Sequence, residues 1–86
     1  MAGSWHVYMV ECADGTLYSG ITTDVDRRVK EHNDSDKGAK YTRAKRPVAL
    51  VYSEEHADRS SASRREYVMK QLSRDEKLAL KATQNP

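Results

Sequence analysis

The sequence predicts one small α/β domain of the α+β kind, with its elements in the order ββαβα followed by a short last helix. Eighty-six residues are enough for one domain and too few for two. Three short segments are rich in the β-branched and aromatic residues that favour strands, and three others begin with residues that cap helices. We therefore expect a single domain over residues 5–82, with flexible tails at 1–4 and 83–86.

The first two strands form a predicted hairpin. Two strand-like segments, 5–12 and 16–21, flank a turn signal that ends in Gly15. A three-residue loop directs Tyr8 and Tyr18 to the same face of the sheet. A two-residue loop shifts the register and puts the two tyrosines on opposite faces. The sequence is compatible with both registers.

The rest of the chain alternates signals for helix, strand and helix. A helix capped by Thr23 or Asp24 is expected to reach about Asn33, and a polar loop then extends to Arg46. A third strand is expected at 48–52, after Pro47. A second helix, capped by Asp58 or Ser60, is expected to run through Leu72. A short third helix then starts with a Ser73–Glu76 capping box and ends near Ala82.

Composition and charge exclude several classes of protein. No apolar run approaches the roughly 20 residues that a membrane span requires, and the first residues lack the basic and apolar regions of a signal peptide. The single cysteine, Cys12, cannot form an internal disulfide, which is typical of a reducing compartment. We therefore expect a cytoplasmic protein with no membrane partner. The net charge of +2 does not by itself indicate a partner.

One segment of the predicted loop is strongly basic. Between Lys37 and Arg46 there are five cations and no acid, and an aromatic residue lies among them. Cations release counterions from a polyanionic backbone and an aromatic ring can stack on a base, so this segment suits nucleic acid. The alternative is a solvated loop whose lysines maintain solubility. The nucleic-acid interpretation predicts contacts through Lys40, Tyr41, Thr42, Arg43, Lys45 and Arg46.

The first predicted helix carries an arginine and a histidine on its apolar face. The positions that follow the spacing of one helical face are Val25, Arg28, Val29 and His32. Packing of the valines on the sheet directs Arg28 inward, where a guanidinium needs an anion, and leaves its neighbour Arg27 pointing to solvent. That anion is a ligand or an internal carboxylate; alternatively, the side chain snorkels past the valines to water. For His32 the alternative is a hydrogen-bonded residue at the helix C-terminus.

The second predicted helix carries a carboxylate at the border of its apolar stripe. Glu66 lies four residues after Ala62, on the edge of the face that packs inward. A carboxylate at such a border can reach a cleft and take one coordination position of Mg²⁺. The alternative is a surface ion pair with Lys70, four residues further along the helix.

Several of these residues recur in an ordered set of motifs. The first two motifs are Val7-Tyr8 and Leu17-Tyr18-Ser19-Gly20, and they are followed by Asp24-Val25-Asp26-Arg27-Arg28-Val29-Lys30-Glu31-His32-Asn33. Glu66 then falls on the helix after the third strand. With this order and spacing, the chain resembles the GIY-YIG nucleases over nearly its whole length, in particular the small stand-alone bacterial members of that superfamily. The basic segment before Pro47 is similar to a loop of those proteins.

The resemblance implies a small three-stranded antiparallel sheet flanked by helices, and metal-dependent cleavage of phosphodiester bonds in DNA. Tyr18 is expected to act as the general base that activates water, with Tyr8 beside it to orient the nucleophile. Arg28 is expected to bind the scissile phosphate, and His32 to hydrogen-bond into the site. Glu66 is expected to hold one divalent metal, Mg²⁺ or Mn²⁺. A free tyrosine has a pKa of about 10, so base catalysis at neutral pH requires Arg28 and the metal to lower it.

The sequence departs from the family pattern at three positions. His6 replaces the nominal glycine of the first motif, Ser19 replaces the isoleucine of the second, and Ile21 stands where some repair members have lysine. None of these changes removes a residue on which the implied mechanism depends.

Two functions are compatible with this pattern. The first is a DNA endonuclease or exonuclease of low sequence specificity, in repair or recombination, which acts on branched, nicked or single-stranded DNA; RNA is an alternative substrate. Because no further recognition domain is expected in the chain, a protein partner or the shape of the substrate would supply selectivity. The second is a non-catalytic nucleic-acid-binding or adaptor module that retains the fold.

Overall fold

The computed structural model describes residues 4–34 and 40–84, except for the side chains of residues 40 and 41. Its elements are β1 (Trp5–Glu11), β2 (Leu17–Thr22), α1 (Val25–Asp34), α2 (Lys40–Arg43), β3 (Ala49–His56), α3 (Arg59–Lys70) and α4 (Arg74–Thr83). The predicted order of strands and long helices is confirmed. The prediction of a plain loop up to Arg46 is wrong at one point, because the short helix α2 interrupts it. None of the described helices has the length and apolar character to cross a membrane.

The three strands form one antiparallel sheet in the order β2-β1-β3. In the hairpin, Tyr8 pairs with Gly20 and Val10 pairs with Tyr18. The loop between β1 and β2 is closed by Gly15, whose φ of +86° is the left-handed conformation that glycine adopts without strain. This is the register of the three-residue loop. Tyr8 and Tyr18 therefore project from the same face of the sheet.

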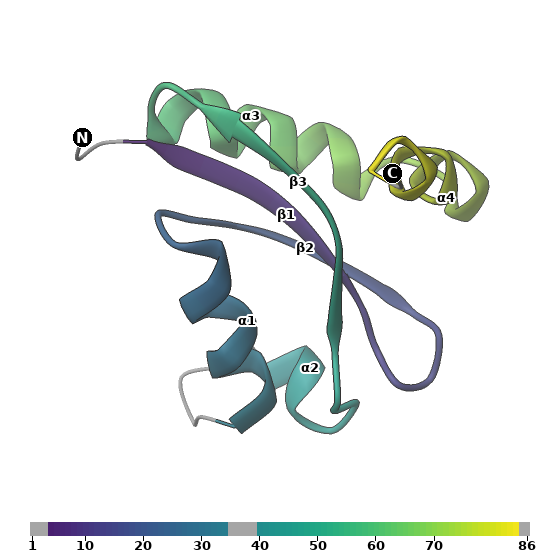
Figure 1. The fold of residues 1–86 in the computed structure, drawn as a ribbon. Helices are drawn as coiled ribbons and strands as arrows, with labels where there is room; N and C mark the ends of the chain where they lie inside the picture. Colours follow the sequence, from purple (N-terminus) through teal and green to yellow (C-terminus); the bar gives the residue numbers. More distant parts are fainter. Residues whose placement is uncertain (1–3, 35–39, 85–86) are drawn as a thin grey trace.

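The helices cover the two faces of the sheet (Figure 1). On one face, β1 packs against α1, and the core there contains Tyr8, Val10, Cys12 and Val48, with Tyr18, Val25 and Val29 at its edge. On the other face α3 and α4 cover a core of Val7, Met9, Tyr52, Ala62 and Met69. The alternation of side chains along β1 thus supplies both cores, because successive residues of a strand point to opposite faces.

Each long helix begins at a polar cap. Asp24 accepts a hydrogen bond from the Arg27 amide, and Asp58 accepts one from the Ser61 amide. At the start of α4, both hydrogen bonds of the predicted capping box are present. The carboxylates, rather than the neighbouring hydroxyl residues, are therefore the caps of α1 and α3.

The predicted end of the third strand is too early, whereas the last helix ends within one residue of its predicted end near Ala82. The third strand was expected at 48–52 but continues to His56, and its polar end is accommodated because Glu54 accepts hydrogen bonds from Tyr52 and Arg65 and bonds to His56. At the C-terminus, α4 includes Thr83, and the Gln84 side chain accepts a hydrogen bond from the backbone of β3. Residues 1–3 and 85–86 of the predicted tails lie outside the described residues.

Candidate active site

Two tyrosines and a histidine form the centre of the candidate site. The Tyr8 hydroxyl, from β1, lies 2.7 Å from Nε2 of His32, which is on α1. The Tyr18 ring, from β2, meets the His32 ring edge-on with 5.4 Å between centroids. His32 is fully buried and Tyr8 nearly so. The inward direction that the helical spacing predicted for His32 is confirmed, and both tyrosines meet at the same imidazole.

Gly20 gives Tyr8 its position. A Cβ atom at residue 20 would lie 2.6 Å from the Tyr8 hydroxyl oxygen and 2.8 Å from Cζ, closer than non-bonded atoms approach. The tyrosine ring therefore lies across the backbone of β2, where only glycine leaves enough room. Since β2 is an edge strand, this contact brings the Tyr8 hydroxyl toward the border of the sheet.

Arg28 reaches the same cluster from α1. Its guanidinium donates to Glu31 over 3.0 Å, so the internal carboxylate considered from the sequence is present. It also lies close enough to Tyr8 to lower the pKa of that tyrosine by hydrogen bonding and by charge. The Arg28 side chain is 24% exposed, compared with 56% for Arg27. The helical spacing thus distinguished the inward arginine from its outward neighbour correctly.

Burial sets the protonation of the two central groups. It raises the pKa of Tyr8 to about 12, against the opposing effects of the hydrogen bond and charge of Arg28, and Tyr18 and Glu66 add smaller upward contributions. Burial, followed by the positive charge of Arg28, lowers the pKa of His32 to about 4. At neutral pH, therefore, Tyr8 keeps its proton and His32 is uncharged.

Glu66 approaches this cluster from the other side of the sheet. Helix α3 packs on β1 and on the edge strand β2, and the negative charge of Glu66 contributes to the raised pKa of Tyr8. The Glu66 carboxylate also pairs with Lys70 over 3.2 Å, as the structural alternative predicted, and its side chain is 23% exposed. Glu66 is thus a partly accessible carboxylate whose charge acts on the tyrosine cluster.

The basic segment has more structural contacts than its sequence indicated. Thr42 is fully buried and lies 2.8 Å from Nδ1 of His32, so it is not at the surface where the sequence interpretation placed it. Lys45 forms an ion pair with Asp14, and Arg46 donates to the His32 carbonyl at the C-terminal end of α1. Arg43 is exposed. The side chains of Lys40 and Tyr41 lie outside the described ones.

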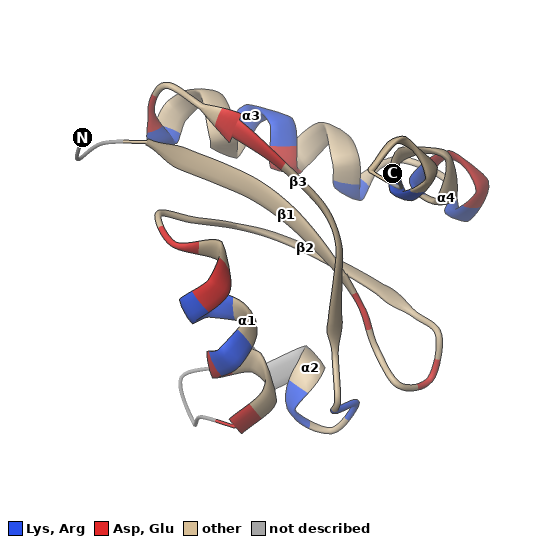
Figure 2. Ribbon diagram, in the orientation of Figure 1, with Lys and Arg blue, Asp and Glu red and all other residues tan. Residues whose placement is uncertain are grey.

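Positive charge is distributed over several elements. Figure 2 shows Lys and Arg on each of the long helices, with Asp and Glu on those same helices. Near the site, Arg27 and Arg28 both face Glu31, at 3.7 and 3.0 Å. Cations and acids are thus interspersed along these helices, and the two arginines nearest the site share one carboxylate.

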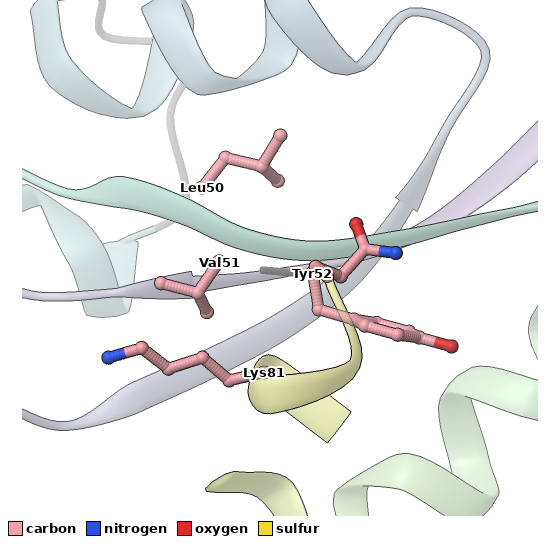
Figure 3. A pocket seen from close by; sticks show the side chains of 5 residues that line it. Leu50, Val51, Tyr52 and Lys81 are labelled. Carbon is pink, nitrogen blue, oxygen red and sulfur yellow. The ribbon is translucent and has the colours of Figure 1, made fainter. Parts of the chain in front are cut away.

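A hollow of about 250 Å³ lies between β3 and α4 (Figure 3). The side chains that line it come from Leu50, Val51, Tyr52, Lys81 and Gln84. None of the predicted catalytic residues is among them. Lys81 is paired with Glu11, and Gln84 holds the backbone of β3. The hollow and the tyrosine cluster therefore have no residue in common.

The family model for the GIY-YIG catalytic domain matches residues 4–79, which include the two tyrosines, Arg28, His32 and Glu66. The chain belongs to the GIY-YIG family. That family is one of nucleases, which bind nucleic acid and generally use divalent metals. The resemblance seen in the sequence is therefore confirmed at the level of the family.

Relatives of this GIY-YIG domain occur in bacteria and archaea. A UPF0213 protein of Desulfotalea psychrophila is 62% identical over 77 residues, which are 90% of this chain and 70% of the relative. One of Halobacterium salinarum is 60% identical over 75 residues, 87% of this chain and 96% of the relative. The solution structure of a UPF0213 protein of Bacillus halodurans, 47% identical, matches with a TM-score of 0.60 over 94% of this chain and 85% of the other. These names specify no activity.

Sequence reasoning missed two residues of the GIY-YIG site. Gly20 belongs to the second motif, but its contact with Tyr8 arises only in the register of the three-residue loop, which the sequence leaves open. Thr42 was assigned to nucleic-acid contact because it lies between cations, whereas it bonds to His32. No local pattern distinguishes a buried threonine from an exposed one in a four-residue helix.

Proposed function

We propose that this GIY-YIG domain is a metal-dependent nuclease that hydrolyses phosphodiester bonds of DNA with low sequence specificity, in repair or recombination. The observation that carries the proposal is the convergence of Tyr8, Tyr18, Arg28 and His32 from three separate elements on one cluster. A carboxylate on α3 acts electrostatically on the same cluster. Tyrosine, arginine and carboxylate together supply a base, an anion-binding group and a metal ligand.

The two tyrosines have different tasks in this proposal. Tyr8 is buried, and with its pKa raised to about 12 it retains its proton at neutral pH. It therefore serves as a hydrogen-bonding group that orients the nucleophilic water. Tyr18, at the edge of the same core, is more accessible to solvent and is the group that we assign, in its phenolate form, to accept the proton of that water.

Arg28 is the phosphate-binding group in this proposal. Its guanidinium is partly exposed, bonds to Glu31 over 3.0 Å and lies near Tyr8, so a phosphate that enters the site finds a cation already held in place. A preorganised donor stabilises the negative charge that develops on a phosphate during hydrolysis. Glu31 accepts from Arg28 in the same way that a phosphate oxygen would.

Glu66 fits a divalent metal of the magnesium type. It is a partly exposed carboxylate, and among the described residues no group of three metal-ligating side chains is present. Mg²⁺ is commonly held by one or two carboxylates, with water and substrate phosphate oxygens completing its shell. When bound there, the ion would polarise the phosphate and neutralise charge on the leaving oxygen.

The test is a cleavage panel with flap, nicked, branched and single-stranded DNA, and with RNA, each with Mg²⁺ or Mn²⁺ and with chelator. We expect metal-dependent products from at least one DNA. Tyr18→Phe and Glu66→Ala should each lower the rate by at least about a hundredfold, because each removes a group that acts in the transition state.

Two matched variants separate catalysis from structure. Lys70→Ala removes the ion-pair partner of Glu66 but not the carboxylate, so cleavage should persist. Tyr67→Phe removes a hydroxyl from an exposed tyrosine beside Glu66 and should leave the rate unchanged. Absence of a metal-dependent product on every substrate, or full activity in Glu66→Ala, would refute the proposal. Salt-sensitive binding without cleavage would favour the non-catalytic module instead.

A further inference from the structure

A buried chain of three side chains extends from α2 to β1. Thr42 Oγ1 lies 2.8 Å from His32 Nδ1, and His32 Nε2 lies 2.7 Å from the Tyr8 hydroxyl. Thr42 and His32 are fully buried, and Tyr8 is 1% exposed. Both ring nitrogens of the histidine therefore have a side-chain partner in the protein interior, where a missing hydrogen bond is costly.

The imidazole in this chain is neutral and carries a single proton. It is buried close to two arginines, Arg28 and Arg46, and these surroundings lower the pKa of His32 to about 4. A neutral imidazole has one nitrogen that donates and one that accepts. Which nitrogen holds the proton depends on the hydrogen bond that the other one makes.

The partners of Tyr8 determine the direction of the hydrogen bonds. Its hydroxyl lies 2.7 Å from Nε2 of His32, and Arg28 is near enough for its guanidinium to lower the pKa of Tyr8 by hydrogen bonding and by charge. A guanidinium can only donate, so it favours a lone pair of the phenol oxygen on its side. The positive guanidinium favours a Tyr8 proton that points away from it, to Nε2 of His32, which accepts it. The histidine proton is then on Nδ1, and Thr42 accepts it.

We propose that Thr42 is a positioning residue: by accepting the Nδ1 proton of His32 it stabilises the tautomer that Arg28 and Tyr8 favour, in which the Tyr8 hydroxyl donates to His32 and keeps its lone pairs on the side of Arg28. The effect on catalysis rests on the proposed nuclease function, whereas the tautomer of His32 is a property of the folded protein whether or not it cleaves DNA. Thr42 thus supports, through His32, the orientation of the hydroxyl of the tyrosine that is proposed to orient the water.

A hydroxyl is well suited to this task. It accepts a hydrogen bond from Nδ1 in a space that excludes water, and its short side chain is held by a backbone that bonds to the following turn through the Lys45 amide. Valine has nearly the same shape but no acceptor, so Nδ1 would lose its partner inside the core. Serine keeps the acceptor and loses only a methyl group.

The direct test is the tautomer of His32 in the full chain, read from the ¹⁵N shifts and long-range ¹H–¹⁵N couplings of the imidazole at neutral pH. In the unmodified protein we expect a protonated Nδ1 and an unprotonated Nε2. Thr42→Val should give a mixture of tautomers or the reversed one, and Thr42→Ser should restore the original pattern. A proton on Nε2 in the unmodified protein, or an unchanged pattern in Thr42→Val, would overturn the inference.

Cleavage kinetics form the second measurement. Thr42→Val should lower kcat by about tenfold, as loss of a supporting hydrogen bond commonly does, with little change in KM, and Thr42→Ser should recover most of the rate. Thr23→Val, at an exposed position, is the matched control and should be neutral. If the protein cleaves and Thr42→Val cleaves equally well, this inference fails and the nuclease stands. If no variant cleaves but the tautomer changes as expected, the nuclease proposal fails and the positioning of His32 stands.

Discussion

Replacing Gly20 with alanine should destabilise the domain through one contact. The new methyl group would lie 2.6 Å from the Tyr8 hydroxyl oxygen and 2.8 Å from Cζ. Relief requires the ring to move by about half an ångström or more before ordinary van der Waals contact is reached. Tyr8 has little space for this movement, because it is 1% exposed and its hydroxyl is hydrogen-bonded to His32.

The expected cost follows from these two restraints. Overpacking of a core costs about 1–3 kcal/mol, and weakening the hydrogen bond to His32 adds about 1 kcal/mol. Gly20→Ala should therefore lower the free energy of unfolding by about 2–4 kcal/mol. With a urea m-value of about 1 kcal/mol/M for a domain of this size, the unfolding midpoint should fall by about 2 M or more.

A double-mutant cycle with Tyr8→Leu identifies the contact as the cause. Leucine ends before the ring atoms that meet the new methyl group, so Gly20→Ala should cost far less in that background. Gly15→Ala is the matched control. Its Cβ meets nothing within 4 Å, and its cost of about 1 kcal/mol comes from the φ of +86°. That cost should be equal in both backgrounds. A Gly20→Ala protein as stable as the original, or an equal cost with and without Tyr8, would refute the reasoning.

Three further stability predictions follow. His32 has a pKa of about 4 when folded and about 6.5 when unfolded, so the unfolded chain binds the proton first as pH falls. Between pH 7 and 5, urea unfolding should therefore show a fall in the free energy of unfolding that is about 2 kcal/mol larger in the original protein than in His32→Gln. Parallel pH profiles of the two proteins would contradict this. Glu54→Ala leaves three hydrogen-bonding partners without an acceptor and should lower the free energy of unfolding by about 1–2 kcal/mol. The control Glu55→Ala, at an exposed position of the same strand, should change that free energy by less than about 0.5 kcal/mol. Equal effects in urea unfolding would refute the role of the network. The Ser19 hydroxyl is buried and has no hydrogen-bond partner among the described residues. Ser19→Ala should therefore raise the free energy of unfolding by about 1 kcal/mol and raise the melting temperature. A lower melting temperature would contradict that account.

Local pattern was sufficient for the strands and long helices and for the direction of the α1 side chains. Helical spacing turned Arg28 and His32 toward the sheet and left Arg27 outside, as the structure has them. Carboxylate and hydroxyl caps marked the helix starts, including Ser73 with its capping box. These features depend on interactions within a few residues, such as backbone periodicity and the unpaired amides at a helix start. They can therefore be inferred before any tertiary contact is known.

The composition of the site was decided by packing between segments that are far apart in the chain. The hairpin sequence allowed two registers, and the observed register put both tyrosines on one face with Gly20 beneath Tyr8. The burial of Thr42 depends on α1 and α2 packing together, which no local pattern reveals. Likewise, Glu66 acts on Tyr8 only because α3 borders the edge strand β2.

The sequence by itself thus determined the α+β class, the order of its strands and long helices and the inward face of α1, because short-range backbone preferences control all three. Only the tertiary structure decided that Tyr8, Tyr18, Arg28 and His32 meet, and that Thr42 supports His32 from within the core. The physical reason is that a hydrogen bond between buried groups requires both partners to be brought within about 3 Å by the packing of whole elements.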